Sequence, residues 1–181
     1  MSFTLEHAEH IPYARFKDAQ LQLANIIAID FFFAKEMLSG AIQGKDKHSD
    51  EVFFHLLLAL SESLRQGHSC LPLAEVANSP FGFQCDHDNM VTHNGFTFPE
   101  LESLNQLVSL YHVMPDANQA VVYNNNKLFL RRYYQFEQEV LEFIDSRCLA
   151  EGATQCQSPT QMATASHCLN ALFPDSVNDN R

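Results

Sequence analysis

The sequence predicts a mainly α-helical fold with a small β-hairpin, placing the chain in the α+β class. Apolar residues recur at three- and four-residue intervals in several segments, as they do on the buried side of a helix. Two β-rich runs flank the asparagines Asn124–Asn126, a residue type that tolerates the positive φ of a tight turn. An apolar fraction of 46% and fifteen phenylalanines in 181 residues can fill a hydrophobic core.

The N-terminal part predicts two helices. The first covers Phe16–Ile27, where Leu21, Leu23, Ala24 and Ile27 form a loose apolar stripe. The second covers Phe31–Leu38, with Asp30 as its N-cap and Ser39-Gly40 as its end.

The next helix has the strongest signal in the chain. Ser49 or Asp50 is expected to cap it, and Gly67 stands where a left-handed residue ends a helix. Its apolar residues share helical spacing: Val52, Phe53, Leu56, Leu57, Leu60 and Leu64. The extended run His68–Leu73 follows, and Pro72 confines this run to a sheet edge or a strand end.

Shorter elements follow this helix. They are expected to be a turn of helix at Ala74–Asn78, a loop over Phe81–Gly95, and a helix over Thr97–His112 whose start resembles a capping box. The predicted hairpin then spans Ala120–Tyr133. A last amphipathic helix places on one side Phe136, Val140, Phe143 and Ile144.

The order of these elements is helix, strand, helix, helix, hairpin and helix, as in winged-helix domains. We therefore expect N-terminal helices over residues 1–47 and a winged-helix-like domain over 48–147. Residues 148–181 are expected to hold a linker, Cys148–Pro159, and a possible helix over Thr160–Phe173.

The charge balance disfavours nucleic acid as the main ligand. Eleven Lys and Arg stand against twenty-two Asp and Glu, a net charge of −11. Between His48 and Gln119 the single basic residue is Arg65. Lys and Arg supply much of the affinity for DNA by neutralising phosphates, so most of this surface should repel it.

The sequence predicts a cytoplasmic protein without a membrane span. The longest apolar runs, Ile26–Ala34 and Phe53–Leu60, are too short to cross a bilayer, and Met1–Glu6 does not resemble a secretory signal. The odd number of cysteines, five, predicts reduced thiols.

No catalytic, cofactor-binding or metal site is predicted. Zinc ligand types occur, but without the usual spacing, at His68, Cys70, Cys85, His87 and His93. Neighbours on a helix point about 100° apart, so His167 and Cys168 are not expected to share a proton. The segment Gly40–Asp46 resembles a phosphate loop, but its glycines are too close and Asp46 replaces the required Ser or Thr.

Lys127, Arg131 and Arg132 form the one basic cluster of the predicted hairpin. These residues either contact a nucleic-acid or partner surface, or Arg131 or Arg132 pairs with Glu137, Glu139 or acids of a partner. The net charge favours ion pairing.

Phe31, Phe32 and Phe33 are the predicted partner-binding residues. Successive helical residues point in different directions, so the three rings cannot all enter one core. At least one is expected to be exposed or covered by something else, and core packing against a second helix and contact with another subunit are both open.

Two segments resemble the N-terminal domain of RecD, the alpha subunit of exodeoxyribonuclease V. Gly67–Leu73 resembles the motif G-H-x-C-L-P-L of that family, and Val121–Tyr134 resembles its hairpin. Weaker similarities bring the resemblance to roughly residues 25–175. It implies a parent protein that is an ATP-driven 5′-to-3′ DNA helicase subunit of the RecBCD complex, which processes double-strand breaks.

The resemblance also implies partners and cofactors. This domain is expected to dock mainly on the RecC subunit, beside RecB in the complex, and DNA is expected to be handled by the full complex. ATP and magnesium would belong to motor domains that follow this chain. The alternative is a stand-alone winged-helix DNA-binding regulator, which is disfavoured because Thr97–His112 contains no Lys or Arg.

Overall fold

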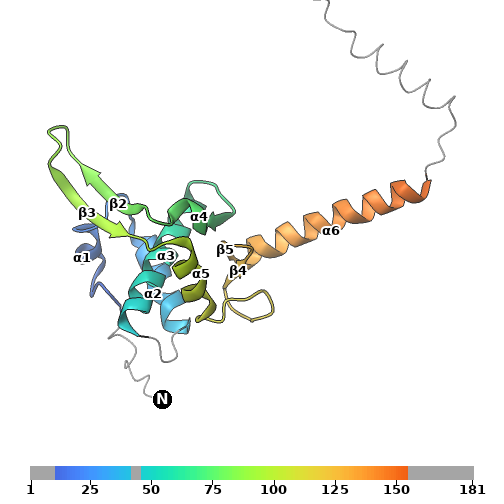
Figure 1. Ribbon diagram of the computed structural model, residues 1–181, viewed down its shortest axis with the longest axis horizontal. Helices are drawn as coiled ribbons and strands as arrows, with labels where there is room; N and C mark the ends of the chain where they lie inside the picture. The colour runs from blue at the N-terminus through green and yellow to red at the C-terminus, as the bar shows by residue number, and fades with distance from the viewer. Residues whose placement is uncertain (1–10, 42–45, 155–181) are drawn as a thin grey trace, which may run out of the picture. The chain divides into compact units, whose positions relative to one another are not determined.

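The computed structural model describes residues 11–41 and 46–154, which form two compact units divided between Phe136 and Glu137 (Figure 1). The helices are α1 Phe16–Gln20, α2 Ala28–Ala41, α3 Lys47–Arg65, α4 Leu73–Val76, α5 Leu101–Ser109 and α6 Arg131–Thr154. The strands are β1 Cys70–Pro72, β2 Pro80–Cys85, β3 Val91–Thr97, β4 Val121–Asn124 and β5 Lys127–Leu130. This confirms the predicted α+β class, mainly α with small antiparallel sheets.

Helix α3 is the centre of the first unit. It is buried on every side, over an unbroken run from Val52 to Leu60. The N-cap is Asp46, whose Oδ1 accepts the Ser49 N–H at 3.0 Å, so the prediction of Ser49 or Asp50 was wrong. The Ser49 hydroxyl also donates to Asp46 Oδ2, at 2.6 Å, and these two hydrogen bonds lower the pKa of Asp46. The residues predicted to form one apolar stripe are therefore part of a helix that other elements surround.

The predicted end of this helix is confirmed. Gly67 has φ +96°, a conformation that glycine adopts at little cost. Its N–H donates to the Leu64 carbonyl, and the His68 N–H donates to that of Ser63, which is the Schellman pattern of helix termination.

The N-terminal helices differ from the prediction. α1 ends at Gln20, and the chain from Leu21 to Ile27 is irregular. The Gln22 carbonyl accepts the Gly95 N–H and the Ala24 N–H donates to Gly82, both at 2.8 Å, so this backbone bonds to a hairpin instead of continuing the helix.

Helix α2 begins earlier than predicted, at Ala28, and Asp30 is its third residue instead of its N-cap. The carboxylate of Asp30 nevertheless caps the helix start, because its Oδ2 accepts the Ile27 N–H at 3.0 Å.

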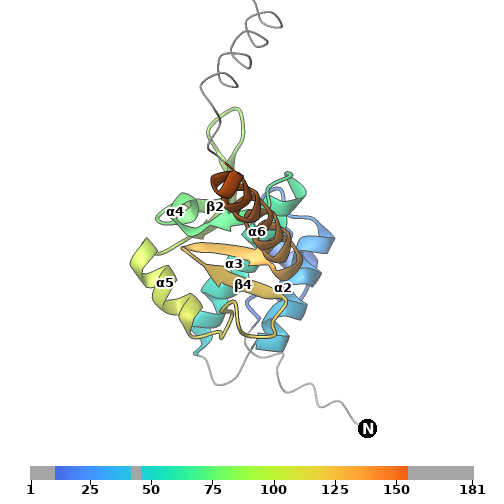
Figure 2. The same cartoon turned by 90° about the vertical axis from the view of Figure 1, so that its right-hand side faces the viewer.

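The predicted Asn-rich hairpin is present. β4 and β5 pair through a turn at Asn125 and Asn126, with φ of 49° and 60°, and β1 pairs with the other edge of β5 in the order β1-β5-β4. α5 and α2 lie on either side of these strands (Figure 2). The second strand ends at Leu130, so Arg131–Tyr133 lie in α6 and not in the predicted strand.

A second hairpin, β2–β3, replaces the loop predicted for Phe81–Gly95. Gly82 and Gly95 have φ of +67° and +70°, and a Cβ on Gly95 would lie 2.8 Å from the Phe81 carbonyl oxygen. Two glycines and a polar turn obscured the alternation that marks a strand. The hairpin reaches past the helices beside it (Figure 1).

The remaining elements follow the predicted order with altered bounds. Thr97 ends β3, and α5 starts after Glu100, whose side chain makes no capping bond, so the predicted capping box was wrong. α6 continues through Cys148 to Thr154, where a linker was predicted. The possible helix Thr160–Phe173 lies outside the described residues.

The hydrophobic core of the first unit runs from Tyr13 to Leu128 and includes residues on both sides of the predicted boundary at 47/48. The N-terminal helices and the elements after them therefore pack as one unit. Among residues 11–41 and 46–154, no helix is long and apolar enough to span a membrane.

Candidate partner-binding site

The three consecutive phenylalanines of α2 have different environments. Phe31 is 1% exposed and its ring lies 5.9 Å from that of Phe54. Phe33 packs partly buried against the core, and Phe32 is 59% exposed. The expectation that at least one ring is exposed is confirmed. Ile29, one turn before Phe32, is 66% exposed and extends the same apolar surface.

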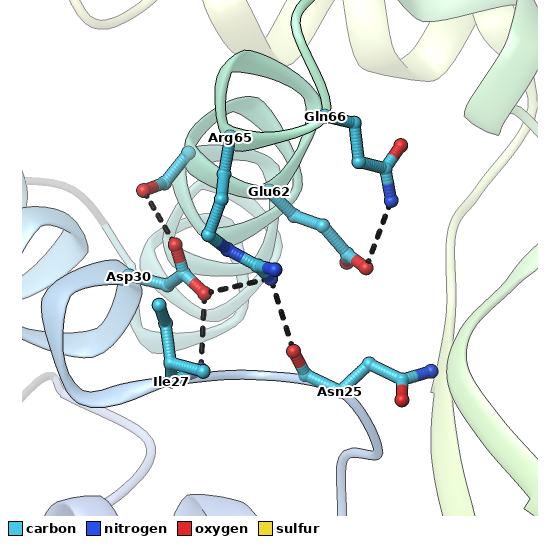
Figure 3. Close-up of polar contacts among 7 residues, drawn as sticks. Asn25, Ile27, Asp30, Glu62, Arg65 and Gln66 are labelled. Carbon is cyan, nitrogen blue, oxygen red and sulfur yellow. Dashed lines mark hydrogen bonds and ion pairs between the residues drawn. The ribbon is translucent and has the colours of Figure 1, made fainter.

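A buried carboxylate, Asp30, fixes α2 against α3 (Figure 3). Its Oδ1 accepts the Ser61 hydroxyl at 2.7 Å, and its Oδ2 lies 3.3 Å from Nη2 of Arg65. Nη2 also donates to the Asn25 carbonyl at 3.0 Å, and Asn25 has a positive φ of 65°. A buried carboxylate with these partners is tolerated because charged and neutral donors replace its water.

Arg65 thereby acquires a structural role. It is the single basic residue between His48 and Gln119, and its side chain is 37% exposed. Glu62 lies beside it, and its hydrogen bond with Gln66 is 3.2 Å long (Figure 3). Burial raises the pKa of Glu62, and the positive charge of Arg65 opposes that shift. The positive charge of Arg65 therefore lies near two acids, Asp30 and Glu62.

An open cleft lies beside this network. It has a volume of about 330 Å³, and its apolar walls are Ile29 and Phe33 from α2, Leu64 from α3 and Leu130 from β5. Arg65 and Arg132 are among its polar lining. The cleft thus combines apolar walls with two guanidinium groups, an arrangement typical of binding sites.

The predicted basic cluster does not form a single patch. Arg131 donates to the carbonyls of Gln119 at 2.5 Å, of Pro115 at 3.1 Å and of Ala117, which fixes the loop before β4. Lys127 is exposed at the hairpin turn.

Arg132 is the member of the cluster that lines the cleft. Its guanidinium lies 4.7 Å from the centre of the Tyr133 ring and donates to the Tyr133 hydroxyl at 3.0 Å. The predicted pairing with Glu137 or Glu139 is absent among residues 11–41 and 46–154, where neither Arg131 nor Arg132 forms an ion pair.

The zinc ligand types remain dispersed in the described part of the chain. Cys85, His87 and His93 border one surface hollow at the β2–β3 hairpin. Nevertheless, no three His, Cys, Asp or Glu of the described residues are placed to hold a metal ion. Cys85 and Cys148 are free thiols, whereas His167 and Cys168 lie outside the described residues.

The segment with a weak likeness to a phosphate loop joins α2 to α3. Gly40 lies near the end of α2, and Asp46 caps α3. Residues 42–45 lie outside the described part. The Asp that replaces the Ser or Thr of a phosphate loop therefore has a structural role as a helix cap.

A second buried polar contact lies inside the core. Nδ1 of His55 is 2.7 Å from the Glu51 carbonyl oxygen, so this nitrogen carries the proton. Nε2 then accepts the Tyr13 hydroxyl at 2.9 Å, and the ring stacks on Phe96 at 3.8 Å. Burial lowers the pKa of His55 to about 4 and raises that of Tyr13 to about 12. The imidazole is thus neutral and structural.

Of the nine residues that line the cleft, only Phe33 and Arg132 were predicted site residues. The other seven were missed from the sequence: Ile29, Asp30, Ser61, Leu64, Arg65, Leu130 and Tyr133. One signal was available, since Ile29 and Phe33 are four residues apart and share a helix side. The isolated position of Arg65 in an acidic region was another. Nothing in the sequence paired Arg65 with Asp30, 35 positions away.

A comparison with protein families identifies the chain. The model described as "RecBCD enzyme subunit RecD, N-terminal domain" matches residues 22–129, more than half of the sequence. The chain belongs to the RecD N-terminal domain family. No curated protein matches it. The matched range contains the Gly67–Leu73 segment and six of the nine residues that line the cleft, whereas Leu130, Arg132 and Tyr133 lie beyond it. Membership gives the chain a role related to RecD and to the DNA-repair setting of RecBCD.

Proposed function

We propose that this domain docks RecD on the RecC subunit of the RecBCD complex through the exposed side of α2. The observation that carries the proposal is the pair Ile29 and Phe32, 66% and 59% exposed, beside an apolar cleft. Scattered exposed apolar residues are ordinary, but large ones grouped beside a cleft mark interaction sites. The family supplies the complex in which the partner occurs.

The charges of the domain support a protein partner over DNA. α5 would have to enter the groove in a winged-helix regulator, and it contains Glu102 but no Lys or Arg. Arg131 is held by three carbonyls, which leaves Lys127 and Arg132 as the exposed cations of the predicted cluster. Phosphate contacts need free Lys and Arg side chains, which this surface largely lacks.

Nucleotide binding belongs, in this proposal, to the motor domains that the family resemblance implies. A phosphate loop needs backbone N–H groups and a Ser or Thr for Mg²⁺. Asp46 instead directs its carboxylate at the start of α3. A thermal shift of this chain on adding ATP and magnesium would contradict this part of the proposal.

The decisive experiment compares two exposed phenylalanines. We expect Phe32→Ala to keep the fold and weaken binding to purified RecC by about 2 kcal/mol, because buried aromatic anchors dominate interfaces. The matched control is Phe83→Ala on β2, where the ring is 48% exposed; we expect its affinity to change little. Binding is measured by biolayer interferometry, and folding is checked by circular dichroism.

Two results would overturn the proposal. If the unaltered chain did not bind RecC at micromolar concentration, RecC would not be the partner of this domain. Normal binding by folded Phe32→Ala, with loss in Phe83→Ala, would move the interface from α2 to the β2–β3 hairpin.

A further inference from the structure

We propose that the cleft between α2, the end of α3 and the β5–α6 junction receives one bulky apolar side chain of the partner, with a carboxylate beside it that binds Arg132. This inference rests on the proposed docking function and specifies the chemistry of its occupant. The occupant is a segment of a partner protein, in which an acidic residue neighbours a Leu, Phe or similar residue.

The walls of the cleft suit an apolar anchor. Ile29 and Phe33 come from one side of α2, and Leu64 and Leu130 come from elements far apart in the sequence. The volume of about 330 Å³ is at the lower end of ligand pockets, about 300–1,000 Å³, and admits one large side chain. Phe33 is packed on the core, which holds this wall in place before binding. A preformed pocket lowers the ordering cost of association.

The two arginines at the cleft differ in whether a carboxylate of the domain already faces their guanidinium group. Arg65 already faces the carboxylate of Asp30, so its positive charge is compensated within the domain. Arg132 is exposed, and within residues 11–41 and 46–154 it has no carboxylate within ion-pair distance. Its guanidinium contacts the ring and the hydroxyl of Tyr133.

Stacking on an aromatic ring holds a guanidinium in place while leaving N–H donors for a carboxylate. Electrostatic complementarity therefore favours a partner that places a negatively charged group at Arg132.

The same charges disfavour a nucleic-acid strand in this cleft. The Asp30 carboxylate lines it, and Glu62 lies beside Arg65 at the end of α3 (Figure 3). A phosphate backbone brings repeated negative charge past both acids, whereas a single carboxylate needs to approach Arg132 alone. The net charge of −11 adds repulsion over a longer range.

The test reverses one charge at the cleft and one outside it. Arg132→Glu and Lys127→Glu make the same change in net charge, and both side chains are exposed, but Lys127 is not part of the cleft lining. We expect Arg132→Glu to weaken binding to RecC at least about tenfold, mainly by faster dissociation, because a contact pair acts on the off-rate. We expect Lys127→Glu to change it less than about threefold, through the on-rate. Arg132→Lys should fall between wild type and Arg132→Glu, because it keeps the charge without the planar guanidinium.

Each outcome has one meaning. If the unaltered chain binds RecC and both charge reversals weaken it equally, this inference fails and the docking proposal stands. If the unaltered chain does not bind RecC, the docking proposal fails and this inference fails with it. Binding of a fluorescent single-stranded oligonucleotide that is lost only in Arg132→Glu would assign the cleft to nucleic acid. Dimerisation of the unaltered chain that is lost in Arg132→Glu would assign it to a second copy. Each of these last two outcomes overturns the inference.

Discussion

The two sides of helix α2 reverse the usual relation between polarity and burial. Facing the core, Asp30 is fully buried beside Phe31, whereas Ile29 and Phe32, its apolar neighbours, are 66% and 59% exposed. A helix turns about 100° per residue, so burying Asp30 and Phe31 together necessarily directs Ile29 and Phe32 elsewhere. Hydrophobicity alone would have favoured a different rotation of the helix.

The hydrogen bonds of Asp30 explain why this rotation is chosen. Its carboxylate holds Ser61, Arg65 and the N–H of Ile27 at once. Rotating α2 to bury Ile29 would break the hydrogen bonds to Ser61 and Arg65, which lie on α3, and would leave those buried contacts unmade. The inner side of α2 therefore stabilises the domain, and the outer side is available for binding a partner.

The largest expected effect is on the inner side. Phe31→Ala removes a ring that is 1% exposed and lies close to the rings of Phe16 and Phe54. Deleting a buried phenylalanine leaves a cavity, so we expect the free energy of unfolding to fall by about 3–5 kcal/mol. Urea denaturation measures it. A loss below about 1 kcal/mol would mean that Phe31 is not part of the core.

Acid should lower the free energy of unfolding through His55, which lies in the core against which the inner side of α2 packs. Burial lowers the pKa of His55 to about 4 in the folded state, against about 6.5 unfolded. Between these values the unfolded chain binds the proton and the folded chain does not. His55 therefore contributes stability that is complete above about pH 6.5 and is lost as the pH falls towards 4, in total about 3 kcal/mol.

Urea denaturation at a series of pH values tests this expectation. His55→Gln, compared at each pH, should show a shallower loss of stability in acid, because the titrating group is gone. Equal slopes in the two proteins would show that other groups govern the acid response.

The Asp30 network should contribute a smaller amount. Asp30→Asn keeps the shape but removes the charge that faces Arg65, so we expect a loss of about 2 kcal/mol, as for hydrogen bonds to charged groups. Arg65 is partly exposed, and water limits the cost. Glu36→Gln on the exposed side of the same helix is the control, with an expected change within about 0.5 kcal/mol. If Asp30→Asn and Glu36→Gln changed stability equally, the hydrogen bonds of Asp30 would not be the cause of the orientation of α2.

The smallest effect on stability is expected on the outer side. Phe32→Ala and Ile29→Ala remove side chains that are mostly in water, so thermal unfolding should shift by no more than about 0.5 kcal/mol in free energy. A loss as large as that of Phe31→Ala would show that the outer side packs against the domain and is not available to a partner.

The sequence by itself determined the elements that local signals define. The two-residue turn at Asn125 and Asn126 needs positive φ, which asparagine accepts, and Gly67 ends α3 for the same reason. The spacing of the α3 residues predicted a helix, and the phenylalanine run predicted that at least one of its rings would be left outside the core. These features depend on residues a few positions apart, so they can be recognised without the fold.

The tertiary structure alone decided the contacts that join distant segments. The backbone at Gln22 and Ala24 leaves the helix because it bonds to Gly95 and Gly82, which no local pattern reveals. Asp30 meets Arg65 across 35 positions, and that pairing sets which phenylalanine of α2 faces outward. Arg131 and Arg132 have the same local sequence preference, yet the carbonyls of the loop before β4 hold the first, and the second lines the cleft. Buried charges and backbone groups must find partners wherever the fold supplies them, and that requirement, which acts over the whole chain, decided the candidate site.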